Sequence, residues 1–181
     1  MADPPGLPAG KLPPELLAAV LGDPAGWPED VPLGPALGED AAAILPPPGP
    51  LVVATDPITL TGEQLGRFAV LVNANDVAVT GARPRWFLAA VLLPPRTDPA
   101  EVRALFAALR ESLEAVGAVL VGGHTEVTPV VARPVVVGQM LGPAGPRGPI
   151  ASGGLRPGDA LVQVGPAPVE GAAVLVNAND V

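Results

Sequence analysis

The sequence predicts an α+β domain in which a mixed four-stranded sheet carries helices on one face. Four β-branched or apolar runs supply the strands, at residues 51–56, 86–94, 118–123 and 133–142. Two segments with helical periodicity, residues 61–79 and 98–116, supply the helices. Because two helices cover only one face of such a sheet, we expect the other face to pack against the sheet of a second copy, in a homodimer.

Composition restricts the class of protein. With 181 residues, 49% of them hydrophobic, the chain can bury the core of one domain, or of one domain and a fragment. The net charge of −8 and the single lysine argue against nucleic-acid binding. The lack of cysteine excludes disulfides and thiolate metal sites. Since neither a signal peptide nor a long unbroken apolar run is evident, we expect a cytoplasmic protein without a membrane span.

Three regions are expected along the chain. A proline-rich N-terminal segment with a short helix at 13–21 covers residues 1–35. The main domain covers residues 36–150, and residues 151–181 begin a truncated C-terminal domain with a strand at 155–165.

The last nine residues repeat an earlier segment. AVLVNANDV at 173–181 matches residues 69–77 residue for residue. Nine residues are too few for a structural repeat, so we interpret the copy as a truncated or rearranged C-terminus. A second metal-binding helix is the alternative.

The helix at 98–116 has the clearest boundaries. Asp98 is the predicted N-cap, Pro99 the first helical residue and Glu101 the capping-box partner. Its apolar face consists of Val102, Leu105, Phe106, Leu109, Leu113 and Val116. Gly117 is expected to end it.

The helix at 61–79 carries the first sign of chemistry. Thr61 and Gln64 predict a capping box at its start, and Gly81 with Pro84 predicts its end. One helical stripe holds four apolar residues and a carboxylate: Leu65, Ala69, Val72, Asp76 and Val79. A carboxylate on the core side near the last turn is costly unless a cation meets it, so Asp76 predicts a metal site.

Further acids are expected near the same site. Residues 38–45 are predicted to form a short strand that returns through PPPGP into the strand at 51–56. This hairpin would place Glu39 or Asp40 close to Asp56. The predicted metal ligands are the acids at strand ends, at loop starts and on the helix: Glu39, Asp40, Asp56, Asp76 and Glu126.

A glycine-containing loop adds a predicted phosphate site. VGGHT at 121–125 follows a buried strand, and its backbone N–H groups can meet an anion, which Gly122 and Gly123 allow to approach closely. Since Mg²⁺ is commonly held by carboxylates together with substrate phosphates, the pattern suggests a magnesium–nucleotide site, although acids at strand ends are also common as caps. His124 is interpreted as an exposed or hydrogen-bonded loop residue, with a ligand or a base as the alternative. Asn73 and Asn75 would orient ligands or satisfy backbone groups.

Four motifs, in order and with similar spacing, resemble the aminoimidazole ribonucleotide (AIR) synthetase superfamily, which is called PurM-like. They are GEDAAAI at 38–44, VVATDP at 52–57, VNANDVAVTGARP at 72–84 and VGGHTEVT at 121–128. The superfamily includes thiamine-monophosphate kinase, selenide water dikinase and the hydrogenase-maturation protein HypE. GKL at 10–12 and the ARPRWFL run are most similar to the HypE-like, AIR synthase-related branch.

The resemblance implies a PurM-like N-terminal domain that dimerises through its sheets and binds ATP and Mg²⁺ between itself and a C-terminal domain. Asp40, with Glu39, and then Asp56 and Asp76 would hold Mg²⁺ and the phosphates. A Gly-Gly-Asp-Thr motif of several relatives falls on Gly122, Gly123, His124 and Thr125. Histidine replaces the acid here, and Glu126 is the expected substitute.

The implied activity is ATP-dependent phosphorylation that activates an oxygen. In the HypE-like branch that oxygen belongs to a carboxamide, which is dehydrated to a nitrile in hydrogenase maturation, and a maturation protein is an expected partner. Because most of the C-terminal domain is absent, the chain itself could be inactive. The alternatives are a noncatalytic dimerisation or regulatory module and a small-molecule kinase like thiamine-monophosphate kinase. No catalytic residue or acceptor substrate is assigned.

Overall fold

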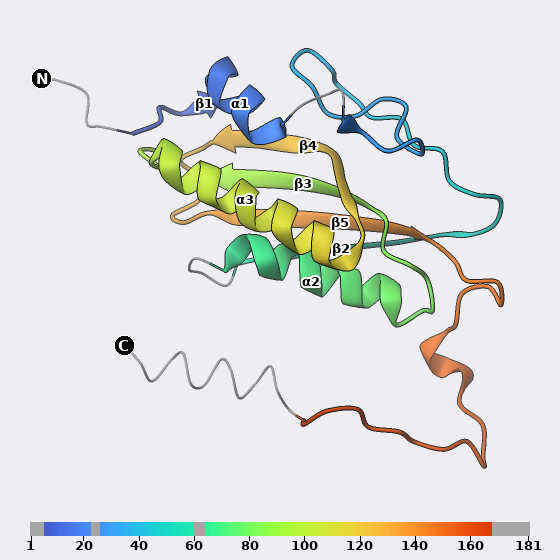
Figure 1. Ribbon diagram of the computed structural model, residues 1–181. Coiled ribbons are helices and arrows are strands. Elements are labelled where there is room, and N and C mark those ends of the chain that lie inside the picture. Colours follow the sequence, from blue (N-terminus) through green and yellow to red (C-terminus); the bar gives the residue numbers. More distant parts are fainter. Residues whose placement is uncertain (1–5, 23–25, 60–63, 168–181) are drawn as a thin grey trace, which may run out of the picture. The chain divides into compact units, whose positions relative to one another are not determined.

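The computed structural model describes residues 6–22, 26–59 and 64–167. It divides into two compact units, Met1–Ala151 and Ser152–Val181. Within its described residues, the first unit holds a five-stranded sheet and three helices (Figure 1). In chain order the elements are β1 (Gly10–Lys11), α1 (Pro14–Leu21), β2 (Leu51–Ile58), α2 (Leu65–Ala78), β3 (Trp86–Leu93), α3 (Pro99–Val116), β4 (Val119–Val127) and β5 (Val135–Pro143).

The strands are ordered β1-β4-β3-β5-β2. The pair β3–β4 is parallel and the other neighbours are antiparallel, so the predicted mixed sheet is confirmed. The predicted count of four strands is wrong by one, because β1 adds a short fifth strand. β1 pairs only with Val127 and Glu126, and no described strand pairs with the outer edge of β4 before them.

The predicted hairpin between residues 38–45 and 51–56 is wrong. Residues 38–45 contribute only one isolated bridge, between Ala43 and Leu33, and β2 pairs with β5 over its whole length. Three consecutive prolines, at 46–48, explain part of this outcome, because they have no N–H group with which to close a tight hairpin. Glu39 and Asp40 therefore do not reach Asp56 through strand pairing.

Helix α3 begins and ends as the sequence predicts. The Asp98 carboxylate accepts a 2.7 Å hydrogen bond from the backbone N–H of Ala100, and Pro99 occupies the first turn. Gly117 takes a left-handed conformation with φ of 72°, which glycine adopts at little steric cost. The buried face of α3 then packs on the sheet.

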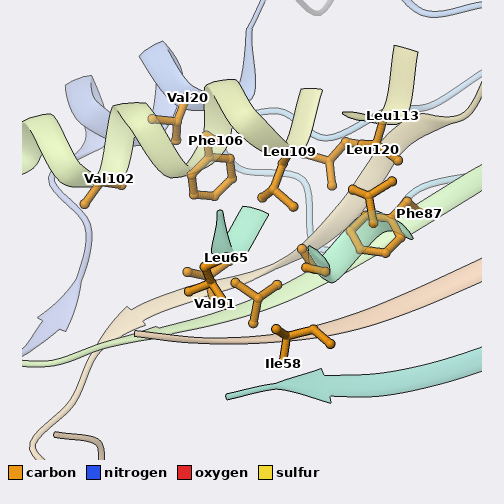
Figure 2. Close-up of a cluster of buried hydrophobic side chains, with 14 of the residues drawn as sticks. Val20, Ile58, Leu65, Phe87, Val91, Val102, Phe106, Leu109, Leu113 and Leu120 are labelled. Carbon is orange, nitrogen blue, oxygen red and sulfur yellow. The ribbon is translucent and has the colours of Figure 1, made fainter. Parts of the chain in front are cut away.

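The main core lies between the sheet and the helices. Figure 2 shows α3 side chains meeting side chains from β3, β4 and α1. Phe87, near the start of β3, is fully buried in this layer, as are Val102 and Leu109 from α3. Leu16 and Val20 of α1 and Leu7 belong to the same core, so the proline-rich N-terminal segment forms part of the main unit.

Helix α2 buries a different face from the predicted one. Its buried residues are Leu65, Gly66, Ala69, Val70, Asn73, Ala74 and Val77. Asp76 and Val79 are exposed, so the predicted core position of Asp76 is wrong. Steps of four and three residues average 3.5 residues per turn, whereas the helix has 3.6. A stripe with this spacing therefore moves gradually around the helix and does not stay on one face. Close packing also selects small residues: a Cβ on Gly66 would lie 2.7 Å from the Leu105 carbonyl oxygen of α3.

The loop of residues 27–45 covers part of the face opposite the helices. Val31 is buried there against Trp86 and Val121, so this loop contributes to a second, smaller core cluster. Leu51 and Val53 of β2 remain exposed, Val53 at 61%. Part of the second face is therefore apolar and open.

The second unit shows little regular structure in its described residues. It contains one short 3₁₀ helix, η2 (Ser152–Gly154), and residues 155–165 form no strand, contrary to our prediction. A strand needs a partner, and no other described residue pairs with this segment. The repeat at 173–181 and Thr61 of the predicted capping box lie outside the described residues. No described helix is both long and apolar enough to cross a membrane.

Candidate functional site

A cavity of about 420 Å³ lies beside β4 and brings together six of the predicted site residues. Its walls come from α1, from the 27–45 loop and from the β3–β4 pair. The predicted residues that line it are Glu39, Asp40, Gly122, Gly123, His124 and Thr125. Two segments about 80 residues apart in the sequence thus share one cavity, which supports a common binding role.

The cavity is also lined by a positively charged residue that we had not predicted as a site residue. Lys11, the only lysine of the chain, lines the cavity together with Glu39 and Asp40. The pairing of β1 with the end of β4 places it there. The GKL motif contained this signal, but composition and periodicity alone did not point to a ligand. An ammonium group at this cavity would favour a bound phosphate.

The two glycines of the GGHT segment differ in whether the structure has room for a side chain at their positions. A Cβ on Gly123 would lie 2.0 Å from the Ala89 carbonyl oxygen of β3, and its φ is +145°. A Cβ on Gly122 would meet only the end of the Leu88 side chain, at 3.6 Å. The close approach of two strands, beside a register shift between Phe87 and Leu88, thus requires glycine at position 123.

His124 lies on β4 rather than in a loop. Its Nε2 atom is 3.2 Å from Oε2 of Glu126, two residues further along the strand, and both side chains are partly exposed. The predicted substitute acid is therefore adjacent to the histidine. Glu126 itself does not line the cavity.

The other predicted acids lie near the opposite edge of the sheet. Asp56 of β2 and Asp76 of α2 are neighbours: the pKa of Asp76 is raised because its side chain hydrogen-bonds to Asp56, with desolvation and charge repulsion adding to the effect. Asn75 is exposed on α2. Asn73 is fully buried, and both its amide N–H groups and its oxygen bond to backbone groups, which is the second of the two predicted roles for this residue, not a nucleotide contact.

The predicted site residues therefore form two groups. β3 and β5 separate β4 from β2, which at about 4.8 Å per strand puts the groups about 14 Å apart. Within the part of the chain that the structure describes, no three His, Cys, Asp or Glu residues are placed to hold one metal ion. A single copy of the chain does not bring all five predicted ligands together.

An ion pair that the sequence did not predict anchors the 27–45 loop. Nε and Nη2 of Arg85 donate to the two carboxylate oxygens of Asp30, each at 2.6 Å. Nη1 of Arg85 donates to the Gly117 carbonyl oxygen. The hydrogen bonds from Arg85 hold the pKa of Asp30 below its ordinary value of 3.8. This pair fixes the base of the loop whose tip carries Glu39 and Asp40.

Arg85→Ala is expected to destabilise the fold by about 2 kcal/mol at neutral pH, because it removes the two charge-assisted bonds. The lowered pKa of Asp30 means that this stability is present above pH 3.8 and is lost as the pH falls through the lower folded value. Urea denaturation of both proteins across this range tests the expectation. The difference between them should shrink in acid, and a difference independent of pH would contradict the role of Asp30.

Comparison with known proteins identifies the family. Residues 38–144 match the family described as "AIR synthase related protein, N-terminal domain". The chain belongs to this family. The match covers the 38–45 segment, the whole of α2 and α3, and strands β2 to β5, and so includes both groups of site residues.

Relatives of this AIR synthase related domain include two kinds of enzyme. Carbamoyl dehydratase HypE of Rhodobacter capsulatus is 34% identical over 149 residues, which cover 77% of the chain and 43% of that protein. Thiamine-monophosphate kinase of Mycobacterium tuberculosis is 32% identical over 148 residues, covering 76% and 43%. The crystal structure of hydrogenase maturation protein HypE in complex with ATP aligns with a TM-score of 0.63 and 27% identity, over 68% of the chain and 39% of that structure. The chain thus spans less than half of the length of these proteins.

Proposed function

We propose that this domain binds a magnesium nucleotide, and that the protein uses ATP to phosphorylate and so activate an oxygen of its substrate. The observation that carries the proposal is the shared cavity, where Lys11, Glu39 and Asp40 face the Gly122–Thr125 segment. A HypE solved with ATP among the similar structures supports the choice of nucleotide. In the transfer, an acceptor oxygen bonds to the γ-phosphorus while the bond from that phosphorus to the bridging oxygen breaks, and ADP leaves.

The Asp56–Asp76 pair fits a divalent cation. The hydrogen bond to Asp56, with desolvation and the charge of the Asp56 carboxylate adding to it, raises the pKa of Asp76, as expected for two acids that share a site. Mg²⁺ is commonly held by one or two carboxylates, with phosphate oxygens and waters completing its coordination. Asp56 and Asp76 would hold it, and it would neutralise phosphate charge when bound. A full set of protein ligands in one copy is therefore not required.

A homodimer would unite the two groups of site residues. The face that carries Leu51 and Val53 is apolar and partly open, as a sheet-to-sheet interface requires. If the two-fold axis runs along the strands, the β2 edge of one copy lies over the β4 edge of its partner. The Asp56 and Asp76 carboxylates would reach the partner's cavity only around the edge of β2, because Asp56, like Val52 and Ala54, lies on the helix-covered side of that strand. The composite site would place a nucleotide between copies of this domain.

Calorimetric titration with ATP, with and without Mg²⁺, tests nucleotide binding. The proposal expects binding that depends on Mg²⁺ and that Asp40→Asn weakens by at least about tenfold, since one carboxylate is lost from a charged site. A folded protein that binds no nucleotide would favour the noncatalytic dimerisation or regulatory module instead.

Mixing two binding-deficient variants tests the composite site. Asp40→Asn and Asp76→Asn, unfolded together and refolded in equal amounts, should regain about a quarter of the wild-type sites, because half of the dimers are mixed and each of these has one intact site. Each variant refolded alone should show no sites of wild-type affinity. No recovery from a mixture that forms dimers would show that the two groups do not act across the interface.

The second candidate function is that of a small-molecule kinase. The 32% identity to thiamine-monophosphate kinase supports it at nearly the level of the HypE relative. Phosphate transfer to thiamine monophosphate would support the kinase, and dehydration of a carboxamide would support the HypE-like activity. A second maturation protein is a proposed partner in the HypE-like case only.

A further inference from the structure

Asn73 is an unusual residue on the buried face of α2. Its exposed fraction is 0%, and the neighbours that share this face, Ala69, Val70 and Val77, are apolar. Burial of an amide costs free energy unless its hydrogen bonds are satisfied. Apolar packing therefore does not explain an asparagine at this position, whereas its bonds do.

The Asn73 amide hydrogen-bonds to the backbone of β2 at Asp56. Its Oδ1 accepts a 2.8 Å hydrogen bond from the backbone N–H of Asp56, and its Nδ2 donates to the carbonyl oxygen of the same residue at a longer 3.4 Å. Nδ2 also donates to the Ala69 carbonyl oxygen at 2.9 Å. β2 is the last strand of the sheet, and no described strand lies along its outer side.

The sheet is shaped to admit this side chain. Gly138 of β5 lies opposite Asp56, and a Cβ there would come within 2.4 Å of Nδ2 of Asn73 and within 2.8 Å of the Phe87 ring. Glycine at 138 thus leaves the space that the amide occupies. Residues from α2, β2, β3 and β5 together build the contact.

We infer that Asn73 is a positioning residue, which fixes the backbone of Asp56 so that the Asp56 carboxylate is held beside Asp76. Asp76 follows Asn73 by three residues, so the two lie about one turn apart on α2. One helix therefore both supplies a carboxylate and orients the other. The inference rests on the proposed function for the role of these acids as cation ligands.

The first measurement is Mn²⁺ binding, followed by the loss of the electron paramagnetic resonance signal of the free ion. Asn73→Ala is expected to weaken binding by at least about tenfold, as loss of a group that orients a ligand typically does. Val102→Ala is the matched control, because Val102 is also 0% exposed but lies on α3. The control should lose thermal stability and keep the wild-type Mn²⁺ affinity.

The second measurement is hydrogen exchange at the Asp56 amide, which needs no metal. Asn73→Ala should accelerate exchange of this amide by at least about tenfold more than that of its β2 neighbours, whereas Val102→Ala should not single it out. If Asn73→Ala does not fold, Asn73→Ser replaces it, because a serine hydroxyl can still donate to the Ala69 carbonyl oxygen without reaching Asp56.

Three outcomes separate the possibilities. Selective exposure of the Asp56 amide with weakened Mn²⁺ binding supports the inference. Wild-type Mn²⁺ affinity in the Asn73 variant, or an unchanged Asp56 amide, overturns it. If the wild-type protein binds no Mn²⁺ while the amide is selectively exposed, the proposed function fails, and the fixing of Asp56 by Asn73 stands.

Discussion

Gly123→Ala is expected to lower the free energy of unfolding by more than about 3 kcal/mol, because it combines two unfavourable effects. The new Cβ would lie 2.0 Å from the Ala89 carbonyl oxygen, and that oxygen belongs to the backbone of a central strand and cannot move aside cheaply. The φ of +145° adds strain for any residue with a side chain. Urea denaturation followed by circular dichroism measures the loss.

Gly122→Ala is the control for this prediction. The added methyl would make an ordinary 3.6 Å contact with Leu88, so we expect a change within about 0.5 kcal/mol. Equal losses for the two variants would show that the β3–β4 register at this point differs from the one described here.

Asp76→Asn is expected to stabilise the metal-free fold and to abolish magnesium-dependent nucleotide binding. The raised pKa of Asp76 means that folding favours its protonated form, so stability is present below pH 3.8 and is lost as the pH rises through the folded value. At neutral pH the carboxylate repels Asp56, and the neutral amide removes that repulsion. The same change removes a cation ligand, for which we expect a loss of affinity of at least about 100-fold.

Thermal denaturation and calorimetry on the same preparations test both halves of this prediction. Glu111→Gln, at an exposed position on α3, removes one negative charge that is not among the predicted ligands and controls for net charge. A drop in the melting temperature of metal-free Asp76→Asn would contradict the repulsion. Unchanged nucleotide affinity would remove Asp76 from the site.

Local sequence signals predicted the elements whose boundaries depend on neighbouring residues. Asp98 and Gly117 delimit α3 because capping and a left-handed turn are properties of a few consecutive residues. Strands β3, β4 and β5 follow from apolar, β-branched runs in the same way. The motifs also predicted a set of site residues, and six of them line the cavity beside β4.

Predictions from local sequence were wrong where the structure depends on residues that are distant in the chain. The stripe through Asp76 was wrong because the contact of Gly66 with α3, and of Asn73 with β2, decides which face of α2 is buried. The hairpin was wrong because β2 finds its partner in β5, more than 70 residues along the chain. No local pattern carries this information, since strand pairing depends on the packing of the whole sheet.

The sequence by itself therefore determined the fold class, most of the elements and the residue types of the proposed magnesium–nucleotide site. Only the tertiary structure decided how those residues are distributed: Glu39 and Asp40 beside β4, and Asp56 and Asp76 at the other edge of the sheet. The tertiary structure also explains the glycine at position 123 and the asparagine at position 73. The physical reason is that close approach of two backbones, and a buried side chain that hydrogen-bonds to the backbone of a distant strand, arise only when distant segments meet in the packed fold.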